Sequence, residues 1–528
     1  MARVDRFSAG RASMTTQGTW APPAPAAGTL AISSALRELE RRLARADHTL
    51  FLAEWRMNTG RPSGGALRAR LARARLLSHP RLLGWCDAAI LRSSGGARRR
   101  LVLLRRQVVD AQLESHPSVA RLNARIERRL LGFRPRWNGR PVSQAEIWDL
   151  VSREPDPARR RAGYYANEPL FVGLEPDVRA LVDARNHRAQ ELGFASYPEA
   201  RLSLEGLSVR SLRDLSAPVL ALGRTASSAL REASPTGSWF PWDMMFAQRQ
   251  ATAHVRRGFS AADCIPAVRA GLKKWGFGPA DLAFRFRRWD TPTAGLALHG
   301  QLPADVGVVC NPRDGIVHYS VLFHEMGHGI HGRAVRGPSP LFRSVGFPGF
   351  AESIGGLFEQ VTCELSWLRT RPGISAEEAR RLRASSYAAL AFRMAELVGE
   401  VESELRLYGR ADADLTGPRR RFLHGTLGYD DHPPISWVDP YHLSPGFHRA
   451  SYLLATCFTE QVVAAGKAAT RGALWPNPRW GPWLKRTWLR PGQRDDWVPK
   501  VRKVTGKPLG PAAFVTTARQ EMAQGLAG

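Results

Sequence analysis

The chain has 528 residues, of which 44% are hydrophobic and 23% charged, so it is long enough for a large buried core and ordinary for a globular protein. It contains no apolar run near the roughly 20 residues of a membrane span, and its first residues lack the apolar segment of a secretory signal. Its five cysteines are widely spaced and odd in number. These features predict a cytoplasmic protein with reduced thiols and no membrane partner.

The formal net charge of +29 comes from 76 basic against 47 acidic residues, and all but seven of the basic residues are arginine. The arginines are spread along the whole chain, without the aromatic-interleaved patch of a nucleic-acid module. We therefore expect an arginine-rich, solvated surface and no specific nucleic-acid partner. Runs such as Arg98–Arg100 leave open a non-specific attraction of polyanions, for which the test is binding to DNA that survives about 200 mM salt.

Residues 1–29 are rich in Gly, Pro, Ala, Ser and Thr, which predicts a disordered lead. A capped helix start is predicted at Ser33, followed by apolar residues at helical spacing. Further helical patterns cover residues 64–80, 97–131, 143–153, 157–168, 175–195 and 208–233. Strand-like residues are scarce, and the best candidates are Ala283–Trp289 and Val306–Cys310. Long helical patterns resume at residues 350–371, 375–409 and 446–467, and shorter ones end the chain.

These patterns predict a mainly α protein, in which residues 30–528 form one helical domain with a few short strands near the histidine-rich segment around residue 324. We expect two helical lobes around a deep active-site cleft. One lobe would comprise residues 30–240 with the C-terminal helices, and the other residues 241–440.

The segment Val321–His331 contains His324-Glu325-Met326-Gly327-His328, the H-E-x-x-H pattern. Residues four apart share one face of a helix, so His324 and His328 can reach one metal ion. Glu325 then lies beside the open coordination position, where it can accept a proton from a bound water. Zinc lowers the pKa of such a water to roughly 7, so the pattern predicts hydrolysis with one catalytic zinc ion. Chance occurrence is the alternative, since the chain has 14 histidines.

A catalytic zinc ion needs a third protein ligand. The longer H-E-x-x-H-x-x-G-x-x-H pattern fails, because position 331 is His and position 334 is Ala. The segment Pro348–Glu359 instead offers Glu352 and Glu359, which lie two helical turns apart on one face among apolar and small residues. A carboxylate in such surroundings costs several kcal/mol unless it is paired or binds metal. A surface or capping role is the alternative for either residue, and is favoured more for Glu359.

Two segments, Phe323–His328 and Pro348–Gly356, together resemble the angiotensin-converting-enzyme family of zinc peptidases, in which H-E-M-G-H precedes a P-G-F-x-E-x-I-G segment. The step from position 324 to position 352 fits that family, and the resemblance implies that Glu352 is the third zinc ligand. His331 and the Glu352…Glu359 pair are more similar to the thimet-oligopeptidase family. Upstream, Arg185–Tyr197 is similar to a segment found in both groups. The resemblance covers most of residues 33–520 and implies a helical gluzincin zinc peptidase.

The resembled families use a His and a Tyr from a C-terminal helical segment to bind substrate and stabilise the tetrahedral oxyanion. The matching stretch here is Tyr441–Tyr452. The resemblance therefore implies that Tyr452 stabilises the oxyanion and that His442 hydrogen-bonds the substrate. His448 competes for the second role. Tyr452 begins an apolar run, so a place in the core is the alternative interpretation.

Several positions depart from the converting-enzyme pattern. Arg449 stands where that family has a second Tyr, and Pro440 stands where it has the Lys that holds the substrate's terminal carboxylate. A carboxy-dipeptidase specificity is therefore not supported, although Arg449 offers a cation. Gly356 replaces the Asp that orients a metal-binding His, which makes Glu359 a candidate for that task.

The leading hypothesis is a zinc-dependent metallopeptidase that hydrolyses short peptides with Glu325 as general base, of the oligopeptidase or peptidyl-dipeptidase type. The main alternative is a zinc hydrolase that acts on a small amide or a modified metabolite. A non-catalytic peptide-binding relative is disfavoured because every metal and base position is present. The sequence leaves the oligomeric state and the natural substrate undetermined.

Overall fold

The computed structural model describes residues 21–22, 29–61, 65–232, 237–251, 258–289, 294–410, 412–434 and 446–525. The predicted disordered lead therefore lies almost entirely outside the described residues. The protein is mainly helical, with few short strands, so the predicted fold class is confirmed. None of its described helices is long and apolar enough to cross a lipid bilayer. The five cysteines are all free, as predicted.

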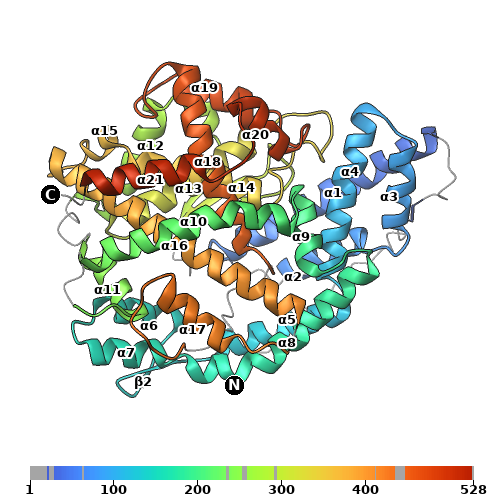
Figure 1. Cartoon of the computed structure of the whole chain (residues 1–528). Helices are drawn as coiled ribbons and strands as arrows, with labels where there is room; N and C mark the ends of the chain where they lie inside the picture. The colour runs from blue at the N-terminus through green and yellow to red at the C-terminus, as the bar shows by residue number, and fades with distance from the viewer. Residues whose placement is uncertain are drawn as a thin grey trace, which may run out of the picture.

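The N-terminal helices build a hydrophobic core of their own (Figure 1). These helices are α1 (Thr29–Met57), α2 (Ala66–Leu77), α3 (Leu82–Leu91) and α4 (Gly95–Glu114). Their buried leucines contact one another, and Leu341 and Phe342 from a distant part of the chain close the cluster. In Figure 1, α3 and α4 lie at the side of the molecule opposite the C-terminus. Burying apolar area in this way stabilises the fold by about 25 cal/mol per Å².

The second group of helices leads from this cluster into the main core. It comprises α5 (Pro117–Gly132), α6 (Gln144–Arg153), α7 (Pro157–Tyr165), α8 (Glu168–Glu191), α9 (Tyr197–Glu205), α10 (Val209–Glu232), α11 (Pro241–Ala251) and α12 (Ala261–Lys274). Between α5 and α6, the strands β1 (Arg136–Trp137) and β2 (Arg140–Pro141) form a hairpin. Asn138 and Gly139 both have positive φ at its turn, which is the conformation that Asn-Gly favours in two-residue hairpin loops.

A three-stranded sheet precedes the histidine-bearing helix. It contains β3 (Arg285–Arg288), β4 (Gly295–His299) and β5 (Val306–Cys310), in the order β3-β5-β4, with β3 parallel and β4 antiparallel to β5. All five residues of β5 are buried, as expected of a central strand covered on both faces. The sequence predicted β3 and β5 but not β4. The edge strand β4 is short and begins with a glycine, so it carries little of the β-branched signal on which strand prediction depends.

The remaining helices surround the sheet and complete the main core, which extends from Val109 to Met522. They are α13 (Ile316–Ala334), α14 (Pro348–Glu359), α15 (Leu365–Leu368), α16 (Ala376–Gly409), α17 (Thr416–Gly425), α18 (Arg449–Thr470), α19 (Trp480–Leu484), α20 (Trp497–Thr505) and α21 (Ala512–Gly525), with the short helical turns η2 (Pro279–Leu282), η3 (Gln360–Cys363) and η5 (Lys485–Leu489). The division into two lobes at residues 240 and 440 stays a prediction.

Three helix predictions need correction. The first helix begins at Thr29, ahead of the predicted start at Ser33. The pattern at 97–131 is two helices, because Pro117 lacks an N–H and starts α5 as its first residue after the break at Ser115 and His116. The pattern at 350–371 is likewise divided into α14, η3 and α15. The long helix predicted at 375–409 is confirmed, and the Ser375–Glu378 capping box fixes its start.

Candidate active site

Helix α13 brings His324 and His328 together on one face. Their Nε2 atoms lie 2.9 Å apart, and their rings meet edge to face. The opposite side of the helix carries buried apolar residues, including Leu322, Phe323 and Ile330, which fasten it in the core. The helix therefore has little freedom to rotate, and the two imidazoles are held in register.

The two glycines of the motif allow neighbouring side chains to come close to α13. A Cβ on Gly327 would lie 2.7 Å from the ring of Phe358 on α14, and a Cβ on Gly329 would lie 2.8 Å from the ring of Phe284. Each glycine costs about 1 kcal/mol of helix propensity relative to alanine. That cost is offset by packing, because no larger residue fits at either position. The groups that approach these glycines are the aromatic side chains of Phe358 and Phe284.

Helix α14 supplies the third donor. Glu352 Oε2 lies 3.4 Å from His324 Nε2, and the ligand atoms of His324, His328 and Glu352 all lie within 4.8 Å of one another. Gly355 makes this arrangement possible, because a Cβ there would lie only 2.4 Å from the His324 ring. The residues that the sequence singled out as a ligand set therefore converge in space.

Glu359 orients His324 from the far side of the ring. Its Oε1 lies 2.7 Å from His324 Nδ1, so Nδ1 faces this carboxylate and Nε2 is the ring atom that faces His328 and Glu352. Burial disfavours a charged His324, but contacts with Glu352 and Glu359 outweigh it and raise the pKa of this imidazole well above its usual value. The spacing in sequence had left Glu352 and Glu359 as competitors, and the structure separates their positions.

This donor set fits a divalent transition metal. Two imidazole nitrogens and a carboxylate oxygen point toward a common centre, and His–His–carboxylate is a donor set that suits zinc with one position left open. His331, by contrast, is fully buried against Phe350. Its burial lowers its pKa to about 3, and it is not part of the three-residue cluster.

Glu325 lies between the three candidate metal ligands and the edge strand β4. Burial raises the pKa of its carboxyl to about 7, which the charge of His324 opposes. The carboxylate also takes a hydrogen bond from the backbone of Ala297 in β4. Gly295 gives it room, because a Cβ there would lie 2.7 Å from Glu325 Cγ. A carboxyl group with a pKa near 7 can take up and release a proton at physiological pH.

The C-terminal candidates are only partly placed together. Tyr452 is 39% exposed and its ring contacts His448 edge to face, with ring centroids 5.2 Å apart. Burial raises the pKa of the Tyr452 phenol to about 12, and the charge of Glu352 adds to it. Burial lowers the pKa of the His448 imidazole, and the negative charge of Glu352 opposes this shift. The predicted partner His442 lies outside the described residues.

Arg449 does not offer a free cation for substrate. It is buried and forms an ion pair with Glu400 on α16. Burial lowers the pKa of its guanidinium to about 9. Breaking a buried pair leaves an uncompensated charge at a cost of about 3–5 kcal/mol, so this pair fastens α18 to α16.

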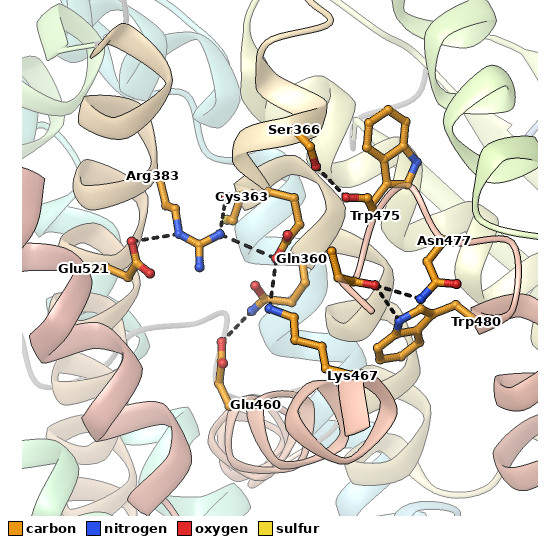
Figure 2. Close-up of polar contacts among 12 residues, drawn as sticks. Gln360, Cys363, Ser366, Arg383, Glu460, Lys467, Trp475, Asn477, Trp480 and Glu521 are labelled. Carbon is orange, nitrogen blue, oxygen red and sulfur yellow. Dashed lines mark hydrogen bonds and ion pairs between the residues drawn. The ribbon is translucent and has the colours of Figure 1, made fainter. Parts of the chain in front are cut away.

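Two buried carboxylates that the sequence did not reveal hold the two ends of α14. Glu205 accepts hydrogen bonds from the backbone N–H of Gly349 at 2.6 Å and from Trp497 Nε1 at 3.1 Å. At the other end, Gln360 Nε2 donates to Glu460 Oε1 of α18 at 3.0 Å, as Figure 2 shows. No local pattern marks either glutamate, because each contact joins residues at least 100 positions apart.

Figure 2 also shows that this second attachment continues into a wider polar network. Arg383 Nη1 donates to the Cys363 carbonyl at 2.8 Å and Arg383 Nε pairs with Glu521 at 2.7 Å. The turn after α14 is thereby bound to both α16 and α21. Burial raises the pKa of Glu460 to about 7.

The fold and the donor set together define a helical protein with a candidate metal site of the hydrolase type. No family model and no curated protein matches the sequence. Among solved structures, the fold is similar to that of the M32 carboxypeptidase from Deinococcus radiodurans R1, with a TM-score of 0.66, 17% identity, and coverage of 94% of this chain and 100% of that one. Trypanosoma cruzi metallocarboxypeptidase 1 matches with a TM-score of 0.64, 14% identity, and coverage of 93% and 99%.

These likenesses extend over almost the whole of both chains, so this protein has the helical fold of those two structures. The assignment to the converting-enzyme or thimet-oligopeptidase families stays a prediction.

We predict that Glu205→Ala destabilises the protein, because two buried N–H donors lose their acceptor at a cost of about 1–3 kcal/mol each. The free energy of unfolding from urea denaturation measures this loss. Glu127→Ala on exposed α5 surface is the control and should leave stability within about 0.5 kcal/mol of wild type. Equal stability of the two variants would contradict a fastening role for Glu205.

Proposed function

We propose that the protein is a zinc-dependent metallopeptidase that hydrolyses short peptides. The observation that carries the proposal is the convergence of His324, His328 and Glu352 beside the buried carboxyl of Glu325. The shared fold adds support, since the two solved structures described above are named as carboxypeptidases. The three donors would hold one zinc ion.

Zinc, when bound, supplies a polarised water at neutral pH. Glu325 would take a proton from that water and later deliver it to the leaving amine. Tyr452 keeps its phenolic proton at neutral pH and donates a hydrogen bond to the oxyanion. His448, in ring contact with Tyr452, orients that phenol. His442 remains a proposed substrate-binding residue.

Removal of a single C-terminal residue is the finer activity that we propose. It requires a cation for the terminal carboxylate, and Arg393 on α16 meets the requirement. Its positive charge lowers the pKa of both Tyr452 and Arg449, which places it near these residues. Its side chain is 47% exposed. Arg393 is paired with Glu396 and Glu400 of its own helix, so the proposed binding of a substrate carboxylate would exchange with these partly exposed pairs.

The second candidate is a zinc hydrolase for a small amide or modified metabolite. It would use the same metal site and the same base, and would differ from a peptidase in the substrate that binds beside them. Mass spectrometry of products from a mixed peptide library separates the candidates, because a peptidase releases amino acids or shorter peptides and the alternative enzyme releases neither.

Metal content provides the first test of the site. We predict that wild type binds one zinc ion and that Glu352→Ala releases it, because two ligands remain. Glu359→Ala should retain zinc with an affinity about 10–100-fold weaker, as expected for loss of an orienting partner. Inductively coupled plasma mass spectrometry and competition with a chromophoric chelator measure both effects. The reverse order of affinities would exchange the two roles.

Substitution of the base provides the second test. Glu325→Gln keeps the shape of the side chain but cannot accept the proton, so we predict that kcat falls by about 10²–10⁴-fold while zinc content is unchanged. Initial rates on the cleaved library peptides give kcat, and metal analysis is the control. If the variant retains wild-type activity, Glu325 is not the base.

Arg393 provides the third test. We predict that Arg393→Gln raises KM about tenfold or more for peptides with a free terminal carboxylate, because a hydrogen-bonded charge pair is lost. C-terminally amidated peptides should be poor substrates for wild type and should not respond to the change. Arg406→Gln, on the same helix, is the control. An equal KM for Arg393→Gln and wild type would rule out the assigned role.

A further inference from the structure

A cavity of mixed polar and apolar lining lies next to the candidate active site, and neither the metal ligands nor Glu325 lines it. Its volume is about 620 Å³, within the range of about 300–1,000 Å³ that is usual for ligand sites. Helices α1, α2 and α4 form one wall, and the β4–β5 connection with the segment Pro340–Val345 forms the other. The cavity thus lies beside the place where α1 packs against the sheet.

The edge strand β4 connects the active site to this cavity. At its start, Gly295 and Ala297 contact Glu325, and at its end His299 and Gly300 line the cavity. His299 also reaches α13, where its Nε2 lies 3.0 Å from the carbonyl oxygen of His328. A bound peptide that runs along β4 away from the candidate metal ligands would therefore reach the cavity.

The edge of β4 that faces away from β5 could pair with an extended peptide near His299, beyond the backbone N–H of Ala297 that Glu325 already accepts. Gly300 N–H donates to Asp305 O, and Asn311 N–H donates to Ala294 O, so the even-numbered residues of β4 bond inward to β5. By the alternation of an antiparallel ladder, Ala297 and His299 direct their backbone groups to the other edge. The bond from Ala297 to Glu325 shows that this edge faces the active site.

Charge distribution indicates what the cavity would accept. Each acidic side chain that lines it is paired with an arginine, in the pairs Glu40–Arg100, Asp47–Arg73, Asp110–Arg201 and Glu114–Arg185. Arg70 is paired with Glu54. Arg343 is different, because among the described residues its guanidinium donates to the carbonyl oxygens of Leu302 and Gly337 and forms no ion pair. It gives this wall a guanidinium group that is not held in an ion pair with any described carboxylate.

We propose that this cavity is a distal subsite for the N-terminal part of a peptide substrate, and that Arg343 selects an acidic residue there. The inference rests on the proposed peptidase function. Antiparallel pairing with β4, the commoner mode, carries the upstream residues from the metal toward Gly300. At about 3.3 Å per residue, the edge from Ala297 to Gly300 covers roughly three residues, so residues about four to six positions before the cleaved bond enter the cavity.

The proposal predicts that cleavage depends on substrate length and on a distant charge. Peptides of roughly two to eight residues, which span from the metal to beyond the cavity, would be compared by kcat/KM, with Glu or Gln at the distal position. We expect kcat/KM to rise when the peptide reaches the cavity, and to be higher for Glu than for Gln. Arg343→Gln should remove the preference for Glu, about tenfold, and leave the shortest substrates unaffected. Arg70→Gln is the matched control, because Arg70 lines the same cavity but is already paired.

A second variant blocks the cavity without altering its charge. Ala74→Trp, or Ala111→Phe if the first variant does not fold, should abolish the advantage of long peptides and keep the activity on short ones. Anisotropy of a fluorescent long peptide on metal-free protein gives an independent measure of binding, which the same variants should weaken. Wild type that cleaves short and long peptides equally, with variants that behave alike, would overturn the distal subsite alone. Wild type that cleaves no peptide of any length would overturn the proposed function and this inference with it.

Discussion

The close approach of α13 and α14 is the constraint on which the site depends. The ring of His324 lies over Gly355, and the ring of Phe358 lies over Gly327, at distances that leave no room for a Cβ on either glycine. The helices can therefore approach more closely than side-chain-bearing surfaces allow, and Glu352 reaches the two imidazoles directly. An alanine at position 355 would displace His324 and separate the donors. The geometry of the candidate metal site thus depends on Gly327 and Gly355 as much as on the three ligand side chains.

Such close packing needs α14 to stay in one position along its axis. Glu205 holds the first turn through Gly349, and Glu460 holds the turn after the last residue through Gln360. Both carboxylates are buried, so each is expensive to leave without its partners. Their elements, α9 and α18, come from opposite parts of the chain. Stability and site geometry are consequently linked: a change that loosens either end of α14 also moves a ligand.

The parts of the site that could be predicted are those specified by local spacing. His324, His328 and Glu325 follow from one helical turn, and Glu352 follows from a second segment that is itself a short helix. The spacing could not distinguish Glu352 from Glu359, because two turns of helix place both on one face; their different contacts with His324 separate them. Glu205 could not be predicted, since tertiary contacts alone give it its place, whereas His448 is already a candidate from its position near Tyr452 in the sequence. In the fold, the central strand Val306–Cys310 carried a strong β-branched signal.

The tertiary structure also shows how many of the arginines are used, because it pairs them with carboxylates. A formal net charge of +29 invites the inference of a uniformly basic molecule. In the described structure, however, many arginines are tied to specific carboxylates, and some of these pairs are fully buried, as Arg160–Asp243 is. A paired arginine contributes little to the field in a nearby cavity, because its partner cancels it at short range. Selectivity for an acidic residue in the cavity between the N-terminal helices and Pro340–Val345 therefore depends on Arg343, whose guanidinium donates to neutral carbonyl oxygens. The position of that one charge, rather than the overall excess, determines which peptides we expect the protein to prefer.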